Sequence, residues 1–230
     1  MTARAEWLLG MRRTAALALG IVPFGIATGV AATEAGMSAL EAVAMSVIVF
    51  AGASQLAVIE LTSSGASIVT LVVVAVVINL RLSLYSASLA EPFGHLPRLR
   101  RAALAYLVTD QAFALSTTRW SEPGEQPHRT AFYLGAGCTL WLSWQLGTAL
   151  GATLGVAAPP SLGLDFAAPL AFIALAVPTL REGTDGAVAI VSVLAYLGLH
   201  AWVPPSAALL GAGAAGLGAG IWLDRRTTPS

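Results

Sequence analysis

The chain has 230 residues, of which 57% are hydrophobic and 10% are charged, and its twelve basic and twelve acidic residues cancel. A soluble domain carries roughly 25% charged residues, so this composition excludes an ordinary soluble protein. The basic residues form no patch of the kind that binds nucleic acid. Because the apolar runs are continuous rather than alternating, they favour transmembrane α-helices over a β-barrel. The sequence predicts an all-α polytopic membrane protein with a single transmembrane domain over residues 1–230.

Seven or eight transmembrane helices are predicted, some of them broken or re-entrant. In chain order the hydrophobic segments are 14–34, 39–63, 67–90, 102–118, 130–157, 163–181, 184–202 and 204–223. The first segment is longer than the ~7–15 apolar residues of a signal peptide, so it is predicted to be retained. Counting every segment as a crossing divides the arginines between the two sides, which gives a mixed result under the positive-inside rule. The short segment 102–118, which carries Asp110, is the first candidate for a re-entrant one.

Two segments are interrupted at membrane depth. Pro23 and Gly25 interrupt the first, and a run of small and polar residues interrupts the second; that run is Gly52, Ala53, Ser54 and Gln55. Paired interruptions are typical of transport sites, because the ends of half-helices offer free N–H and C=O groups to a substrate. A simple proline kink at Pro23 and close helix packing at the small residues are the alternatives.

Arg81 is the strongest polar anomaly, because it lies deep inside segment 67–90. A charge at that depth costs at least ~2.5–3.5 kcal/mol and should face a partner in the bundle interior. Asp110, which is followed by Gln111, is the predicted counter-charge. Tyr85 shares a helical face with Arg81, whereas Asn79 lies about 160° away and needs a separate contact. Either one or both of Arg81 and Asp110 recognise a zwitterionic substrate or exchange a proton during transport, or the pair is purely architectural.

Further candidates lie elsewhere along the chain. Trp141 and Trp144 fall on one helical face and are predicted to line a pocket. Glu60 is expected at the membrane interface unless its helix is broken, and Asp165 is expected to cap a helix. Cys138 has no partner for an internal disulfide. The sequence shows no catalytic constellation, metal-ligand spacing or phosphate loop, so neither an enzyme nor a cofactor is predicted.

Six motifs in order along the chain resemble the AzlC family. They are Gly20–Gly25 (GIVPFG), Ser46–Gln55 (SVIVFAGASQ), Asn79–Tyr85 (NLRLSLY), Leu107–Phe113 (LVTDQAF), Trp141–Thr148 (WLSWQLGT) and Gly163–Phe166 (GLDF). The similarity covers about residues 15–200. It implies the large subunit of an exporter of branched-chain and related apolar amino acids in the bacterial inner membrane, driven by the proton gradient.

The resemblance also implies a partner, a small four-span subunit of the AzlD type. The sequence does not determine the oligomeric state, and an oligomer is possible. Two positions depart from the family pattern: Leu82 stands where a histidine is frequent, and Gln111 where a glutamate is frequent. Both replacements remove a titratable group, so Asp110 remains the main carboxylate for a proton route. The alternative function is a membrane scaffold subunit that transports nothing and uses its polar pairs only for architecture.

Overall fold

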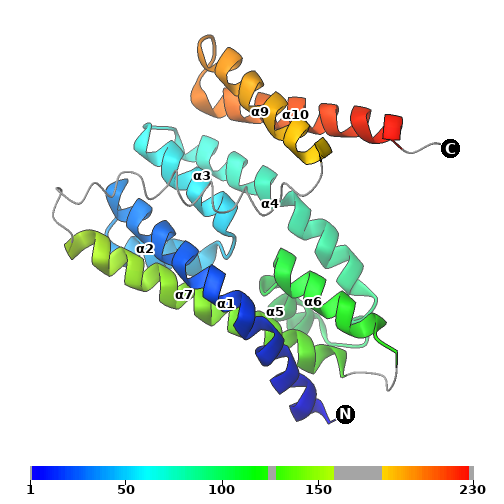
Figure 1. Ribbon diagram of the computed structural model, residues 1–230. Helices are drawn as coiled ribbons and strands as arrows, with labels where there is room; N and C mark the ends of the chain where they lie inside the picture. Colours follow the sequence, from blue (N-terminus) through cyan, green and yellow to red (C-terminus); the bar gives the residue numbers. More distant parts are fainter. Residues whose placement is uncertain (1, 124–127, 158–182, 228–230) are drawn as a thin grey trace.

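The computed structural model describes residues 2–123, 128–157 and 183–227, and every regular element in them is a helix (Figure 1). The predicted segment 163–181 and the cap at Asp165 lie outside these residues. The helices are α1 Ala3–Glu34, α2 Ala39–Ile48, α3 Gly52–Ser63, α4 Ile68–Ala90, α5 Arg98–Tyr106, α6 Asp110–Ser121, α7 Arg129–Ala157, α9 Gly183–His200 and α10 Pro205–Thr227.

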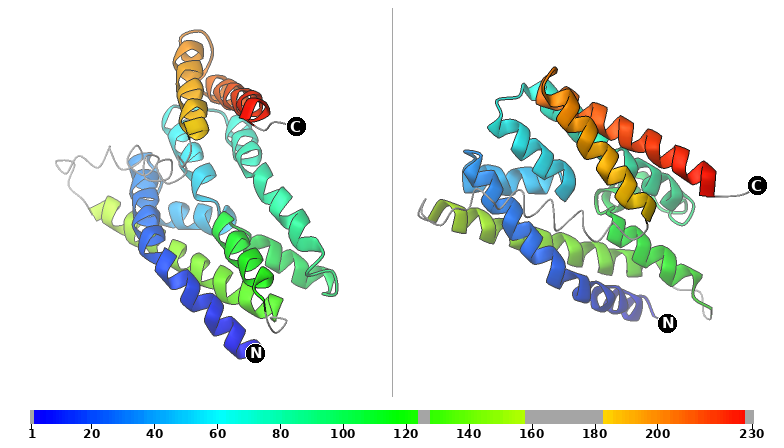
Figure 2. Two further views of the ribbon diagram at one scale, coloured as in Figure 1. Left: turned by 45° about the vertical axis from the view of Figure 1, so that its right-hand side comes forward. Right: turned by 45° about the horizontal axis from the view of Figure 1, so that its top comes forward.

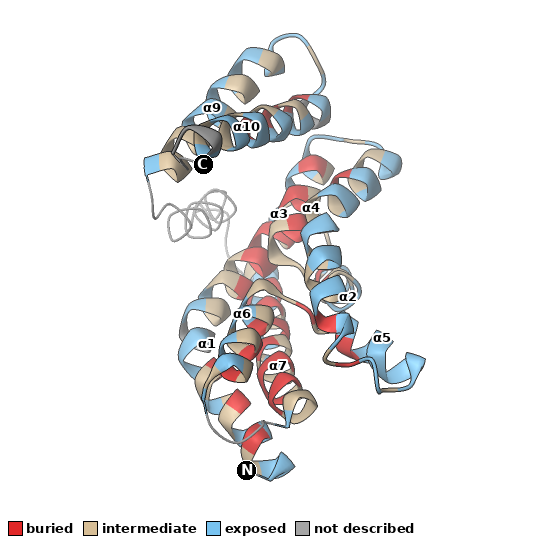
Figure 3. Cartoon of the chain, turned by 90° about the vertical axis from the view of Figure 1, so that its right-hand side faces the viewer, coloured by how far each residue is buried: buried red, intermediate tan, exposed pale blue. Residues whose placement is uncertain are grey.

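Helices α1 and α7 form a parallel pair whose backbones touch. A Cβ on Gly25 would lie 3.1 Å from the carbonyl oxygen of Trp144, and one on Gly147 would lie 2.7 Å from that of Val22. One turn later Gly29 and Gly151 repeat the close approach. Small residues every fourth position are the usual means of packing two helices closely in a membrane. Figure 3 shows the buried residues gathered along α7, where it faces α1.

Helix α1 runs through Pro23 but bends before it. Its halves, Ala3–Leu17 and Gly20–Glu34, lie at 63° to each other. A proline ring clashes with the carbonyl four residues earlier and leaves it without a hydrogen bond, which places a kink one turn ahead of the proline. The predicted interruption therefore takes the form of a kink in a continuous helix.

Helices α2 and α3 form a re-entrant hairpin rather than one crossing. Residues 49–51 separate the two helices. The break therefore lies immediately before the predicted interruption, whose first residue, Gly52, begins α3. Ala42 of α2 and Ile59 of α3 pack in one buried cluster with Ala31 at the end of α1. Because both helices lie against the same half of α1, the chain returns to the side from which it entered. The single span predicted over 39–63 stays a prediction, and in the described structure this segment is divided into two helices.

Helices α5 and α6 form a second hairpin, which enters from the opposite end (Figure 1, Figure 2). The break falls at Leu107–Thr109. Arg98 at the start of α5 shares a cavity with Phe93, which follows α4, and the ring of Trp120 near the end of α6 lies 5.8 Å from that of Phe93. The predicted segment 102–118 is thus divided into two helices, and its re-entrant path stays a prediction. Each half-helix spans about half of a ~30 Å hydrocarbon layer.

Among the described residues, three helices are long and apolar enough to cross a membrane, namely α4, α9 and the Ala207–Asp224 part of α10, or four if the bent α1 counts as one span. The predicted total of seven or eight crossings stays a prediction. Helices α9 and α10 pack on each other on either side of a break that ends before Pro205. Unlike α7, α9 has no buried residue (Figure 3).

The hairpins change the predicted orientation of the helices. A hairpin that returns to the side from which it entered does not count as a crossing, so the loops before and after it lie on the same side. Apart from Arg81, the arginines of α1–α7 gather at the end where α1 begins, α4 ends and α6 ends. They are Arg4, Arg12, Arg13, Arg98, Arg100, Arg101, Arg119 and Arg129. The opposite end of α1–α7 carries Glu34, Glu41 and Glu60 and, among the described residues, no arginine. Within α1–α7 the arginines therefore lie at one end, which the positive-inside rule predicts to face the cytoplasm.

Candidate functional site

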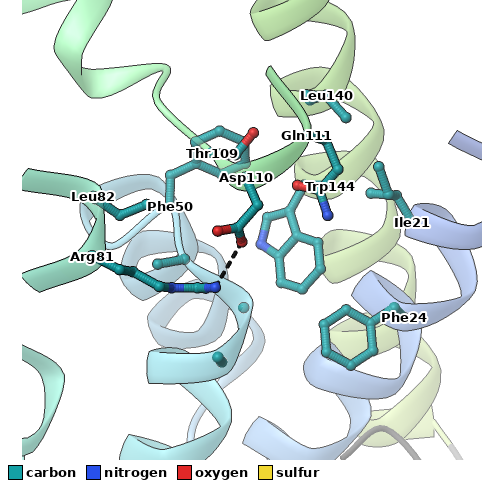
Figure 4. A pocket seen from close by; sticks show the side chains of 13 residues that line it. Ile21, Phe24, Phe50, Arg81, Leu82, Thr109, Asp110, Gln111, Leu140 and Trp144 are labelled. Atoms are coloured by element: carbon teal, nitrogen blue, oxygen red, sulfur yellow. Dashed lines mark ion pairs between the residues drawn. The ribbon is translucent and has the colours of Figure 1, made fainter. Parts of the chain in front are cut away.

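The two hairpins converge on a pocket beside the middle of α4 (Figure 4). The second helix of each hairpin, α3 or α6, begins there and runs outward to its own end of the bundle. Helices α1 and α7 complete the wall. The lining residues are Ile21, Phe24, Phe50, Ala51, Gly52, Ala53, Arg81, Leu82, Thr109, Asp110, Gln111, Leu140 and Trp144.

Two polar side chains of α4 each contact a different hairpin. Arg81 Nη1 lies 2.8 Å from Asp110 Oδ2 at the start of α6. Asn79 Nδ2 donates to Ser54 Oγ in α3 at 3.0 Å. Two residues along a helix point about 160° apart, so these contacts lie on different faces of α4. The predicted pairing of Arg81 with Asp110 is present, and Asn79 has the separate contact that helical geometry requires.

The two helix N-termini at the pocket differ in charge. Thr109 accepts a hydrogen bond from the backbone N–H of Ala112 at 3.1 Å, and Asp110 places a carboxylate in the first turn of α6. At the start of α3, by contrast, the N-cap residue Ala51 makes no side-chain cap. The first N–H groups of a helix have no intrahelical partner and carry a partial positive charge. The end of α3 therefore remains available to an anion, whereas a carboxylate already balances the end of α6.

Trp144 forms a fixed aromatic wall of the pocket. Its indole Nε1 donates to Gln55 Oε1 at 3.0 Å, and its ring lies 5.3 Å from that of Phe24. Gly52 lies against the same indole, because a Cβ there would be 2.6 Å from Trp144 Cη2. Only 5% of Trp144 is exposed. The glycine at the start of α3 thus permits the tryptophan to close against the half-helix.

The structure brings together only part of the predicted site. Six predicted residues line the pocket, namely Gly52, Ala53, Arg81, Asp110, Gln111 and Trp144. Ser54, Gln55 and Asn79 stand behind them in the hydrogen bonds just described. The pocket also takes residues that the sequence did not single out, among them Phe24, Phe50 and Leu140. Each lies within four residues of a predicted site residue, and that proximity is the only signal that could have found it.

The other four predicted residues also lie outside the lining. Trp141 Nε1 donates to Tyr106 Oη at 2.7 Å, so this tryptophan joins α7 to α5 and does not face the pocket. Tyr85 stacks on Phe113 at 4.7 Å between α4 and α6. Gly25 faces the backbone of α7, and Pro23 is likewise absent from the lining. The packing and kink interpretations, which the sequence left open, account for these last two.

Among the described residues, no group of three or more histidine, cysteine, aspartate or glutamate side chains could hold a metal ion. Glu60 is exposed at the outer end of α3 and does not line the pocket. Asp110 is therefore the carboxylate of the pocket.

The AzlC family model, described as AzlC protein, matches residues 16–157. The chain belongs to the AzlC family. The matched region covers most of α1 and all of α2–α7, so it contains the pocket and both hairpins. The resemblance inferred from the six motifs is confirmed.

Relatives of this AzlC chain are membrane proteins. It is 30% identical over 159 residues to inner membrane protein YgaZ of Escherichia coli, a match that covers 66% of the chain and 62% of YgaZ. It is 32% identical over 174 residues to an uncharacterized membrane protein of Archaeoglobus fulgidus, with 72% of both chains covered, and 27% identical over 173 residues to one of Helicobacter pylori, with 75% of both covered. No solved structure matches. These names and the apolar helices confirm the predicted localisation in the inner membrane.

Proposed function

We propose that this AzlC protein is a secondary transporter that exports branched-chain or related apolar amino acids, driven by the proton gradient. One observation carries the proposal: an Arg81–Asp110 ion pair stands between two converging half-helices, beside an aromatic and aliphatic wall. Half-helix ends beside a charged pair are a recurring arrangement in secondary transporters. A pocket that offers both charge signs and an apolar surface suits a zwitterion with an apolar side chain.

Each part of such a substrate has a counterpart in the pocket. The carboxylate binds the guanidinium of Arg81 and the uncapped N–H groups of α3 near Gly52, because helix N-termini and arginine both favour anions. The ammonium faces the carboxylate of Asp110. The aliphatic side chain packs on Phe24, Leu140 and Trp144. Trp144, and not Trp141, is therefore the tryptophan assigned to substrate.

Asp110 is also the residue proposed to couple transport to protons. Protonation of its carboxyl removes the charge that holds Arg81, and loss of the proton restores the pair. This exchange switches Asp110 between an ionised state, in which its carboxylate can face the substrate ammonium, and a neutral state, in which it cannot. We further propose that export requires a small four-span subunit of the AzlD type, as the family resemblance implies.

The second candidate function is a scaffold subunit that transports nothing. It is favoured by the observation that the same ion pair joins α4 to α6, and could therefore serve only to hold the hairpin in place. The two functions differ in what a reversed pair would do. A reversed pair can restore an architectural contact, but it places the wrong charge next to each end of a substrate and next to the N-terminus of α6.

Export is tested in inverted membrane vesicles that contain the chain with its small subunit. Accumulation of labelled leucine driven by an acidic vesicle interior is measured for wild type, Asp110→Asn, Arg81→Gln and the double reversal Arg81→Asp/Asp110→Arg. We expect wild-type accumulation to vanish with a protonophore, and all three variants to lose it at normal membrane abundance. Arg12→Gln, which removes an arginine far from the pocket, is the matched control. Full accumulation by the reversed variant, or proton-driven accumulation by Asp110→Asn, would contradict the assigned roles.

A further inference from the structure

A second cavity of about 290 Å³ lies between the end of α4 and α5. It shares no residue with the transport pocket. Its floor is apolar and buried, formed by Leu89, Phe93, Leu104 and Val108, each less than 5% exposed. Two exposed arginines, Arg98 and Arg101, stand at its rim. The cavity therefore combines an apolar interior with two positive charges at one side.

These arginines have no counter-charge in the described part of the chain. The ion pairs there use Arg13, Arg81 and Arg119, and none involves Arg98 or Arg101. Glu91, the acidic residue nearest to them in sequence, is exposed and joins neither. Two adjacent guanidinium groups match a phosphate, since arginine binds phosphate oxygens through paired hydrogen bonds. The charge at the rim thus favours binding of an anion, and the apolar floor favours binding of a hydrocarbon chain.

The position of the cavity indicates which kind of anion with a hydrocarbon chain would reach it. It lies where α4 ends and α5 begins, at the arginine-rich end assigned to the cytoplasm. The cytoplasmic leaflet is rich in anionic lipids, and basic pockets between helices on that side bind their headgroups. We propose that this cavity binds an anionic phospholipid of the cytoplasmic leaflet, with the phosphate on Arg98 and Arg101 and an acyl chain along the apolar floor. The bound lipid would fix α5, the outer helix of the hairpin that carries Asp110.

Native mass spectrometry of the purified full chain tests the proposal. The protein is exchanged into equimolar phosphatidylglycerol and phosphatidylcholine, and retained lipid is counted. We expect wild type to retain phosphatidylglycerol in preference. Arg98→Gln and Arg101→Gln should each reduce that preference about fivefold, since an arginine near an anionic surface contributes about 1 kcal/mol. The double variant Arg4→Gln/Arg12→Gln removes as much charge as the double variant Arg98→Gln/Arg101→Gln, at the same end but away from the cavity, and should keep the preference.

Two further arms separate a lipid site from other interpretations. Ala102→Phe fills the cavity without changing charge and should also reduce retained phosphatidylglycerol, whereas inorganic phosphate should not displace it. Equal retention of both lipids by wild type would overturn the proposal, and so would equal losses in the Arg98/Arg101 and Arg4/Arg12 double variants. Displacement by inorganic phosphate would identify a phosphate site instead. Size-exclusion profiles confirm that each variant is folded, and export is not needed as a readout, so failure here leaves the transport proposal standing.

Discussion

The carboxylate of Glu6 accepts two hydrogen bonds from the guanidinium of Arg119, at 3.2 Å from Nε and 2.5 Å from Nη2. This contact joins the first turns of α1 to the end of α6, and Glu6 is completely buried. Arg119 also lies 2.9 Å from Glu122, whose carboxylate pairs with Arg13. Four charges thus join α1 to α6 at the arginine-rich end of the bundle, whereas Asp110 lies at the opposite end of α6.

We predict that Arg119→Gln destabilises the protein far more than Arg13→Gln does. Removing Arg119 leaves the buried carboxylate of Glu6 without its guanidinium, and breaking a buried pair costs about 3–5 kcal/mol. Arg13 and Glu122 are each about one-third exposed, and pairs of that kind contribute about 0–1 kcal/mol. Thermal unfolding in detergent, followed by fluorescence-detected size exclusion, measures both. Equal shifts for the two variants would contradict the buried pair.

The thermal stability of the protein at acidic pH should depend on the ionisation of Glu122. Its hydrogen bond with Arg13 is the main cause that holds the pKa of Glu122 below the ordinary value of 4.5. A lowered pKa stabilises the fold above the unfolded value and loses that contribution as pH falls through the folded value. The difference in melting temperature between wild type and Glu122→Gln should therefore be constant above about pH 5 and shrink in more acidic buffer. A difference that instead shrinks between neutral pH and pH 5 would rule out this assignment.

Gly52→Ala should impair transport before it impairs folding. The added Cβ would lie 2.6 Å from Trp144 Cη2 and 2.9 Å from Phe24 Cε1, so the aromatic wall must shift away from the N-terminus of α3. Overpacking of this kind costs about 1–3 kcal/mol. We expect reduced leucine accumulation in inverted vesicles at near-normal abundance. Gly65→Ala, in the turn before α4, is a contrasting control, because its φ of +74° strains the backbone but it lies far from the pocket.

Cysteine labelling tests the hairpins directly. On a Cys138→Ser background, Met37→Cys and Ser64→Cys flank α2 and α3, and Leu99→Cys lies at the start of α5. We expect an impermeant maleimide to label the first two from the periplasmic side and the third only after the cytoplasmic side is opened. Labelling of positions 37 and 64 from opposite sides would show that segment 39–63 crosses the membrane and would refute the hairpin.

The sequence predicted the centre of the site better than its surroundings. Arg81 and Asp110 could be paired because two charges at membrane depth must find each other. Segment 102–118 could be named as a re-entrant candidate from its short length and Asp110, but the hairpin of 39–63 could not be predicted, since hydrophobic periodicity records which face is apolar and not the direction in which a chain leaves a break. Trp141 and Trp144 share a helical face, yet a small rotation around α7 gives them different partners, Tyr106 and Gln55.

The network at Glu6 escaped prediction for a different reason. Glu6 precedes the first apolar segment and Arg119 follows the fourth, so each reads as an ordinary charge at a membrane boundary. Only the parallel packing of α1 on α7, with α6 against both, brings them together. Their sequence separation of 113 residues leaves no local pattern to find.

The bond between Arg81 and Asp110 has a consequence for selectivity. In the empty pocket each residue serves as the counter-ion of the other. A ligand that separates them must therefore replace the single Arg81–Asp110 pair with two new pairs, one to each residue. A zwitterion compensates both residues as it enters, whereas a ligand with a single charge compensates one and strands its neighbour in a region where an unpaired charge is expensive. We therefore predict that the pocket discriminates against simple amines and carboxylates of the same shape through this charge compensation alone, without any contact to the aliphatic side chain.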